Sequence, residues 1–229
     1  METLFNGFTL DIAPGTFPLS TDSIALADFV RLPRQAKVLD LGSGCGTIGI
    51  LLCAKDYSCQ VTGIELDQAA HTMALKNKDD NQLQDRFQSI CADFTDITNQ
   101  VSRGSFDVCV SNPPYFTAGF LSKSTPLARH EESCSLDALI ESAAYSLKFG
   151  GDFYLVHKPE RLAEIFAAAS RHKLEPKRLC LMRHKEGGPV SLILVQCRKG
   201  AKPGLIWEEN ALHDASGQPT PYYNSIYHL

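Results

Sequence analysis

Apolar and polar positions along the chain follow two periods. Short runs dominated by Val, Ile, Leu and Phe predict buried strands, and longer stretches with apolar residues three or four apart predict amphipathic helices. The predicted strands cover residues 38–41, 60–65, 87–91, 106–111, 152–157, 179–182 and 190–197. The predicted helices cover residues 22–32, 48–54, 67–77, 136–147 and 161–172.

Strand and helix segments alternate from residue 38 to residue 172. Such alternation predicts an α/β fold, in which helices cover both faces of a doubly wound, mostly parallel sheet of seven strands. A short turn around residues 186–188 joins the last two predicted strands, so we expect one antiparallel strand at an edge. No linker or repeat interrupts the pattern, and we expect a single domain over residues 1–229. It divides into an N-terminal segment (1–34), a core (35–205) and a C-terminal tail (206–229).

The composition is that of an ordinary globular protein. The 229 residues are 44% hydrophobic and 21% charged, which argues against disorder. No apolar run approaches the ~20 residues that span a membrane, and the first residues lack the pattern of a signal peptide. The eight cysteines are scattered without a C-x-x-C pair. We therefore expect reduced cysteines in a cytoplasmic protein, with neither disulfides nor a metal site.

Charge is distributed unevenly along the chain. The whole chain carries a net charge of −4, but residues 158–202 contain eleven Lys and Arg against four Glu, a net of +7. Such a basic stretch can form a binding face for an anionic partner, or it can be a set of solvated surfaces.

A glycine-rich turn between a predicted strand and the next helix is the first candidate binding site. Gly42, Gly44 and Gly46 follow the strand at alternate positions, after the acidic Asp40. A dinucleotide-binding loop would instead need its third glycine at Thr47. The spacing resembles the cofactor loop of class I methyltransferases, which use S-adenosylmethionine. Strand, turn and helix together place backbone N–H groups beside a small ligand.

Acidic residues follow the next two strands. Glu65 lies 23 positions after Gly42, where a carboxylate can accept the ribose hydroxyls of an adenosine cofactor. Asp93 can accept the adenine amino group while Phe94 packs on the ring, or it can simply cap a helix.

The most specific signal is the run Ser111-Asn112-Pro113-Pro114-Tyr115 after the fourth predicted strand. It resembles the catalytic motif of enzymes that methylate an amino or amide nitrogen in a planar π-system. The lone pair of such a nitrogen is delocalised, so the nitrogen is a poor nucleophile. The Asn112 side-chain oxygen and the Pro113 carbonyl can accept its hydrogens and hold it in line with the methyl group. The two prolines stiffen the turn, and Tyr115 offers a face for stacking a flipped-out base.

Further blocks extend the resemblance to one family. Residues 20–27 (STDSIALA), 128–131 (ARHE), 155–162 (LVHKPERL) and 198–200 (RKG) are similar to the bacterial valine-tRNA adenine-N6 methyltransferases, over about residues 7–205. The resemblance implies a Rossmann-like methyltransferase fold, S-adenosylmethionine as donor, S-adenosylhomocysteine as product, a tRNA adenine as acceptor, and no metal. It assigns Thr21, Asp40, Gly42, Ser43, Gly44, Glu65, Leu66, Asp93, Phe94 and Asn112 to cofactor binding, and Asn112, Pro113, Pro114 and Tyr115 to catalysis.

Two alternative functions stay open. A protein glutamine-N5 methyltransferase uses the same chemistry and the same N-P-P-Y run. A catalytically silent RNA-binding scaffold would not need the intact run. If RNA is the substrate, we expect the basic stretch 158–202 to contact it. Arg198, Lys199 and Lys202 would then meet phosphates near the mouth of the site, and Lys158 and Arg161 would extend the patch.

Overall fold

The computed structural model describes residues 2–16, 18–114 and 135–228. Its strands are β1 (Glu2–Thr3), β2 (Thr9–Leu10), β3 (Lys37–Leu41), β4 (Gln60–Glu65), β5 (Phe87–Cys91), β6 (Phe106–Ser111), β7 (Leu147–His157), β8 (Leu174–Lys185), β9 (Val190–Lys199) and β10 (Ile206–His213). Its α-helices are α1 (Thr21–Phe29), α2 (Thr47–Lys55), α3 (Gln68–Asp80), α4 (Ile97–Gln100), α6 (Leu136–Ser146), α7 (Leu162–Arg171) and α8 (Pro221–Tyr227). Short 3-10 turns cover η1 (Phe5–Gly7), η2 (Phe94–Asp96) and η3 (Pro159–Arg161).

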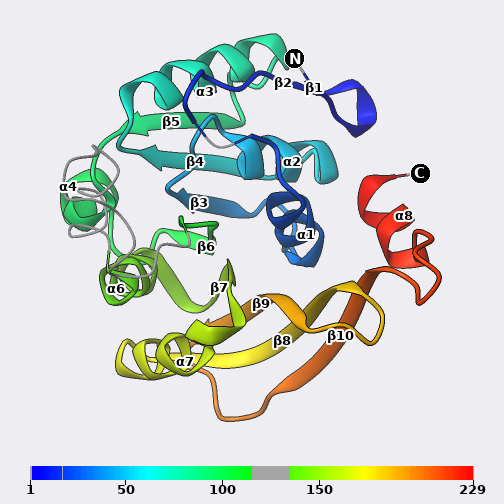
Figure 1. Ribbon diagram of the computed structural model, residues 1–229. Coiled ribbons are helices and arrows are strands. Elements are labelled where there is room, and N and C mark those ends of the chain that lie inside the picture. Colours follow the sequence, from blue (N-terminus) through cyan, green and yellow to red (C-terminus); the bar gives the residue numbers. More distant parts are fainter. Residues whose placement is uncertain (1, 17, 115–134, 229) are drawn as a thin grey trace, which may run out of the picture.

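The described strands form an eight-stranded main sheet in the order β10-β8-β9-β7-β6-β3-β4-β5, and β1 pairs with β2 separately (Figure 1). β9 runs antiparallel to both of its neighbours, and the other strand pairs of the main sheet are parallel. The expected α/β fold with a doubly wound, mostly parallel sheet is confirmed. Two details were wrong: the main sheet has eight strands instead of seven, and the antiparallel strand lies inside the sheet instead of at its edge.

Both differences have a physical reason in the last third of the chain. Residues 206–213 pair with β8 in parallel and form the edge strand. Ile206 and Trp207 are exposed on this strand and two glutamates follow them, so its hydrophobic pattern does not mark it as buried. The β8–β9 hairpin could join the sheet through either of its strands, and β9 takes the place beside β7.

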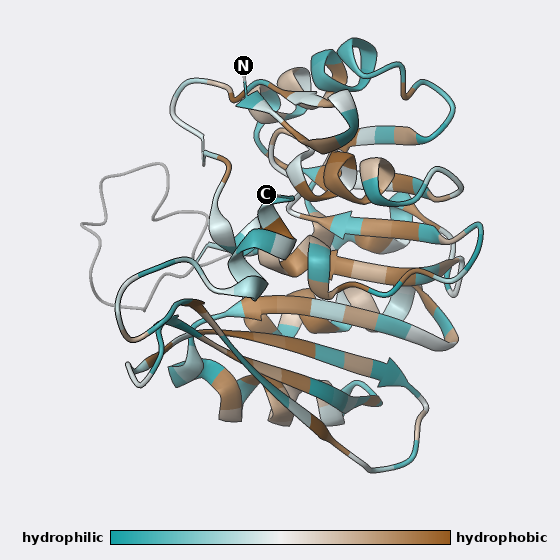
Figure 2. Cartoon of the chain, turned by 90° about the vertical axis from the view of Figure 1, so that its right-hand side faces the viewer, coloured by the Kyte–Doolittle hydropathy of each residue, from teal (hydrophilic) through white to brown (hydrophobic). Residues whose placement is uncertain are grey.

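Two hydrophobic layers cover the two faces of the sheet. One layer contains Val38, Val108 and Tyr154 with residues of α1, α2, α3 and α8. The other contains Leu39 and Cys109 with residues of α6 and α7. Adjacent strand residues alternate between the layers because successive side chains point to opposite faces. Hydrophobic residues concentrate along the strands and hydrophilic residues in many of the turns (Figure 2).

Strands β3 to β7 are mutually parallel and end at one edge of the sheet, which we call the carboxyl edge; the opposite edge is the amino edge. Glu65 is the last residue of β4, and the glycine-rich turn, Asp93 and Asn112 follow β3, β5 and β6, so all of them lie at the carboxyl edge. In open α/β sheets this edge is where ligands bind.

The basic stretch is divided between the two edges. Because β9 runs antiparallel, Arg198 lies opposite Asp152, and Lys199 lies opposite Leu174 at the start of β8. Arg198, Lys199 and the following Lys202 therefore lie at the amino edge. The expectation that these three cations lie near the mouth of the site was wrong, because the direction of β9 carries them away from it.

Other cations of the stretch lie at the carboxyl edge. Lys158 and Arg161 follow the end of β7, and residues 183–185 (Arg-His-Lys) end β8. His213, which ends β10, lies opposite Lys185.

Two properties of the described residues bear on function. No helix among them combines the length and the hydropathy needed to cross a membrane. Within the same ranges, no group of three His, Cys, Asp or Glu side chains is arranged to hold a metal ion.

Candidate cofactor and substrate site

The glycine-rich turn is held in shape by strand β4. The backbone N–H groups of Gly42 and Ser43 both donate to the carbonyl of Ile64, at 2.9 and 3.1 Å. Gly42 and Gly44 have φ values of +71° and +55°, a region that L-residues with side chains rarely adopt. A Cβ atom at either glycine would meet nothing within 4 Å. The turn therefore borders open space at its two predicted cofactor positions.

Glu65 is joined directly to this turn. Its Oε2 accepts from the Gly44 N–H at 2.7 Å, and its Oε1 accepts from the Asp67 N–H at 2.8 Å. The carboxylate thus bridges the turn and the first residues before α3 while its side chain stays half-buried. Leu66, the next residue, is exposed beside it.

Asp40 is the most unusual group near the turn. It is completely buried (0% exposed), and neither carboxylate oxygen has a hydrogen-bond partner among the described residues. Burial raises the pKa of Asp40 to about 7; the nearby Gly49 amide opposes this rise without forming a hydrogen bond, and the negative charge of Glu65 adds to it. A buried carboxylate without hydrogen-bond donors is costly in its ionised form unless a positive charge nearby offsets it. S-adenosylmethionine carries two positive groups, a sulfonium and an ammonium, so the negative charge of Asp40 fits this cofactor.

Ser43 also has a buried hydroxyl without a hydrogen-bond partner in the described ranges. Its side chain lies against Gly63 of β4, where an added Cβ would come within 2.6 Å of the Ser43 oxygen. The glycine in β4 therefore makes the room that Ser43 occupies.

Asp93 and Phe94 follow the end of β5, next to β4. Asp93 Oδ1 accepts from the Thr95 N–H at 2.8 Å, so the residue does cap the short turn η2. Phe94 is half-buried against the second hydrophobic layer. This cap uses only Oδ1 of the carboxylate, so it is compatible with both predicted roles of Asp93, the helix cap and the acceptor for the adenine amino group.

Asn112 follows β6, beside the strand that carries the glycine-rich turn. Its Nδ2 donates to the hydroxyl of Ser23 at 3.0 Å. Ser23 is 7% exposed and belongs to the first turn of α1, which Ser20 caps by accepting from the Ser23 N–H. Pro113 is half-buried and Pro114 exposed. Tyr115 and the block 128–131 lie outside the described residues.

Thr21 begins α1 and points toward the C-terminal tail. Its Oγ1 lies 2.7 Å from the hydroxyl of Tyr227 in α8. Ser20 caps the helix. Thr21 is thus tied to the tail, whereas Ser23, two residues later, is tied to Asn112.

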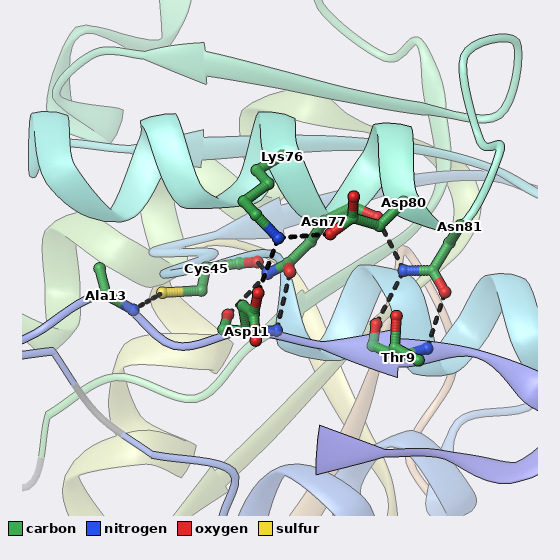
Figure 3. Close-up of polar contacts among 8 residues, drawn as sticks. All are labelled: Thr9, Asp11, Ala13, Cys45, Lys76, Asn77, Asp80 and Asn81. Atoms are coloured by element: carbon green, nitrogen blue, oxygen red, sulfur yellow. Dashed lines mark hydrogen bonds and ion pairs between the residues drawn. The ribbon is translucent and has the colours of Figure 1, made fainter. Parts of the chain in front are cut away.

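An N-terminal strap, residues 9–13, crosses α3 and the glycine-rich turn (Figure 3). The Asn77 amide accepts from the Asp11 N–H and donates to the Asp11 and Cys45 carbonyls, at 2.8, 2.8 and 2.9 Å. Asn81 accepts from the Thr9 N–H and donates to its carbonyl, both at 2.7 Å. The strap is therefore fixed to the same turn residue, Cys45, that lies between Gly44 and Gly46.

The structure brings the predicted residues together in two groups. The Gly44 N–H donates to Glu65, and Asp40 lies close enough to Glu65 for the charge of Glu65 to raise the pKa of Asp40. Asn112 instead contacts α1. Sequence reasoning did not identify Ser23 or Asn77. Only Ser23 had a usable signal, because it is a polar residue within the otherwise apolar buried side of α1.

The sequence model of the methyltransferase small domain matches residues 19–169. A tRNA1(Val) (adenine(37)-N6)-methyltransferase of Photobacterium profundum is 27% identical over 93% of this chain and 91% of its own length. The protein of the same name from Shewanella halifaxensis is 31% identical over 79% of this chain and 72% of its own length.

A solved structure shows the same fold over most of the chain. A predicted O-methyltransferase of Agrobacterium tumefaciens superposes with a TM-score of 0.76, covering 91% of this chain and 96% of its own. The two sequences are 23% identical.

Proposed function

This chain belongs to the methyltransferase small domain family and to the family of bacterial valine-tRNA adenine-N6 methyltransferases, and from that premise we propose that it transfers a methyl group from S-adenosylmethionine to the N6 amine of an adenine in tRNA. The observation that carries the proposal is the position of Asn112. It begins the Asn-Pro-Pro run at the carboxyl edge, one strand from the glycine-rich turn, with its amide held by Ser23.

We propose that the residues around the turn hold the cofactor. Bound S-adenosylmethionine would supply an electrophilic methyl group on its sulfonium, the sulfur would leave as the uncharged thioether of S-adenosylhomocysteine, and the proton released by the methylated amine would pass to water. Glu65 accepts the ribose hydroxyls, Asp93 and Phe94 receive the adenine, and Gly42, Ser43 and Gly44 offer backbone N–H groups and space. Asp40 balances the positive charge of the methionine end, and Thr21 and Leu66 border the cofactor.

Asn112 and Pro113 orient the acceptor amine. Nδ2 of Asn112 donates to Ser23, and Oδ1, as an amide oxygen, accepts a hydrogen of the amine. The carbonyl of Pro113 accepts the second hydrogen. Two acceptors draw the nitrogen toward pyramidal geometry, which frees its lone pair. Pro114 stiffens the run, and Tyr115 stacks the adenine.

The charge distribution supports a narrower RNA contact than the whole basic stretch. Lys158 and Lys185 share the carboxyl edge with Asn112, and we assign RNA contact to them. Arg161 and Arg183 lie at the same edge, but Arg161 forms a bidentate pair with Glu164 at 2.6 and 2.7 Å, and Arg183 lies 3.4 Å from Glu209. At the amino edge, Arg198 forms a bidentate pair with Asp152 at 2.9 Å, and Lys199 donates to the Ala144 and Leu147 carbonyls.

Such an enzyme acts as a single domain in the cytoplasm, where its tRNA substrate is found.

Transfer of labelled methyl groups tests the proposal. The protein is incubated with labelled S-adenosylmethionine and either total tRNA or total protein, and the tRNA is then digested to nucleosides. We expect label in N6-methyladenosine and none in protein. Label in glutamine of a protein would support the glutamine-N5 alternative, and no label in either pool would leave the scaffold alternative.

A further inference from the structure

Four aromatic rings form a continuous row at the carboxyl edge. We call it the ring row: His184 at the end of β8, His213 at the end of β10, and Tyr223 and Tyr227 in α8. The ring centroids of successive members lie 5.0, 5.4 and 4.5 Å apart, with interplanar angles of 48°, 44° and 30°. These spacings are those of interacting aromatic rings.

The two ends of the ring row differ. The inner end is Tyr227, whose hydroxyl lies 2.7 Å from Thr21 Oγ1. Thr21 and Ser23 share the first turn of α1, and Ser23 holds Asn112. The outer end is His184, which is exposed, while the three inner rings are half-buried. The row therefore leads from solvent to the helix that borders the reacting group.

Charge near the outer end suits a polyanion. In the sequence, His184 is flanked by Arg183 and the exposed Lys185. Arg183 donates to the Gly188 carbonyl and lies 3.4 Å from Glu209, and Glu186 follows Lys185 in the exposed turn. Lys185 is thus the cation that can meet a phosphate beside His184.

The proposed substrate requires such a surface. The N6 amine of a paired adenine is already hydrogen-bonded, so the acceptor must be an unpaired or flipped-out base. Proteins bind unpaired nucleotides by stacking bases on aromatic side chains and by contacting phosphates with cations. On the basis of the proposed function, we propose that the ring row stacks an unpaired base of the tRNA loop near the target adenine, on the outer face of His184.

A base-deletion cycle tests the ring row. The substrate is a stem-loop RNA that contains the target adenine, and each other unpaired base is replaced in turn by an abasic residue. Steady-state kinetics give KM for each RNA with the parent enzyme, with His184→Ala, and with His184→Tyr, which keeps a ring. Tyr57→Ala is the matched control, since Tyr57 is 66% exposed and precedes β4 at the amino edge.

We expect His184→Ala to raise KM for the intact RNA roughly 5-fold or more, the weaker end of base–aromatic stacking. The kcat and the affinity for S-adenosylmethionine stay at parent values, and His184→Tyr restores KM. For one abasic position, the parent enzyme should show a higher KM for the abasic RNA than for the intact RNA. The His184→Ala variant should show the same KM for both RNAs, because the missing base and the missing ring belong to one contact. Tyr57→Ala should match the parent throughout.

Three results would overturn the inference. In the first, KM is unchanged in His184→Ala. In the second, every abasic RNA raises KM by the same factor in the parent and in His184→Ala, so that no base depends on the ring. Either result leaves the proposed function intact, because the parent still methylates the RNA. In the third, the parent methylates no RNA, and both the proposed function and the ring row fail. If the Tyr223→Leu variant folds with a melting temperature near that of the parent and has an unchanged KM, the inner rings only pack the tail and do not support base stacking.

Discussion

The two edges of the sheet differ in how completely the protein satisfies its own polar groups. At the amino edge the charges are largely satisfied within the protein: Arg198 with Asp152, Lys199 with two carbonyls, and Lys55 with the three carbonyls that end α1. At the carboxyl edge Asp40 is buried without a partner among the described residues, and the glycine-rich turn borders open space. A surplus of charge therefore says little about binding until the partners of each charge are known.

The largest expected effect is at Asn112. Asn112→Ala should cut kcat by roughly 100-fold or more, as when a positioned transition-state acceptor is lost, with the fold and most cofactor affinity intact. Single-turnover methyl transfer measures it. The matched change at the other edge is Arg198→Ala, for which we expect kcat within a factor of two of the parent. Activity of Asn112→Ala within a few-fold of the parent would remove the Asn-Pro-Pro run from catalysis.

The next effect is on the cofactor. Glu65→Ala should weaken S-adenosylmethionine binding by about 2 kcal/mol, through loss of charge-assisted hydrogen bonds. Calorimetric titration measures the change. Glu65 also holds the Gly44 N–H, so Glu65→Gln, which keeps an acceptor for that amide, separates ribose binding from support of the turn. Unchanged affinity in both variants would place the ribose elsewhere.

A smaller effect is expected at Ser23, which positions Asn112. Ser23→Ala should lower kcat roughly 10-fold, a part of the Asn112 effect, because the amide loses its fixed orientation. In the Asn112→Ala background the same change should have almost no effect on kcat. If Ser23→Ala lowered kcat equally in both backgrounds, the serine would act on the fold of α1 and not on Asn112.

Asp40 should give the carboxyl edge a pH-dependent stability. Its raised pKa means that between about pH 4 and pH 7 the folded state binds a proton that the unfolded state has released, so stability falls as the pH rises through this window. Asp40→Asn should flatten this fall, by on the order of 1 kcal/mol or more between pH 4.5 and pH 8. Urea unfolding at the two pH values checks it, and parallel pH profiles of parent and variant would contradict it.

The smallest expected effect is at the amino edge. Reversing Lys199 and Lys202 to Glu should leave both the affinity for tRNA and its salt dependence unchanged, since neither residue lies near the carboxyl edge. Lys185→Glu, at the carboxyl edge, should instead flatten the slope of log affinity against log salt concentration by about one unit, for one lost phosphate contact. A salt titration of tRNA binding compares the three proteins. A flatter slope in the Lys199 and Lys202 variant would show that the amino edge contacts RNA and would contradict this prediction.

Much of the fold could be predicted from local patterns. The predicted bounds of β4, β5 and β6 agree with the structure because these are short, central and buried strands whose apolar runs end abruptly. Prediction failed for β10, an edge strand with Ile206 and Trp207 exposed, and for the place of β9. Strand order is decided by long-range packing, and a hairpin read from sequence does not say which of its strands joins the sheet.

The site was predictable to the extent that strand ends define it. The glycine-rich turn, Glu65, Asp93 and Asn112 each follow a predicted strand, so their shared edge follows from a parallel sheet. Their roles stay predictions. The bonds of Asn112 to Ser23 and of Thr21 to Tyr227 join residues 89 and 206 positions apart, and no local pattern encodes such pairs. The same limit explains the misplaced cations, since the direction of β9 decides to which edge Arg198 belongs.

The bond between Thr21 and Tyr227 has a consequence for the order of synthesis. A ribosome makes Thr21 long before Tyr227, and the two hydroxyls can meet only after the intervening sheet has formed. Contacts of such high sequence separation form late and slowly. A nascent chain that stops short of α8 would therefore carry the glycine-rich turn and the Asn-Pro-Pro run, yet begin its first helix without the hydroxyl that anchors it.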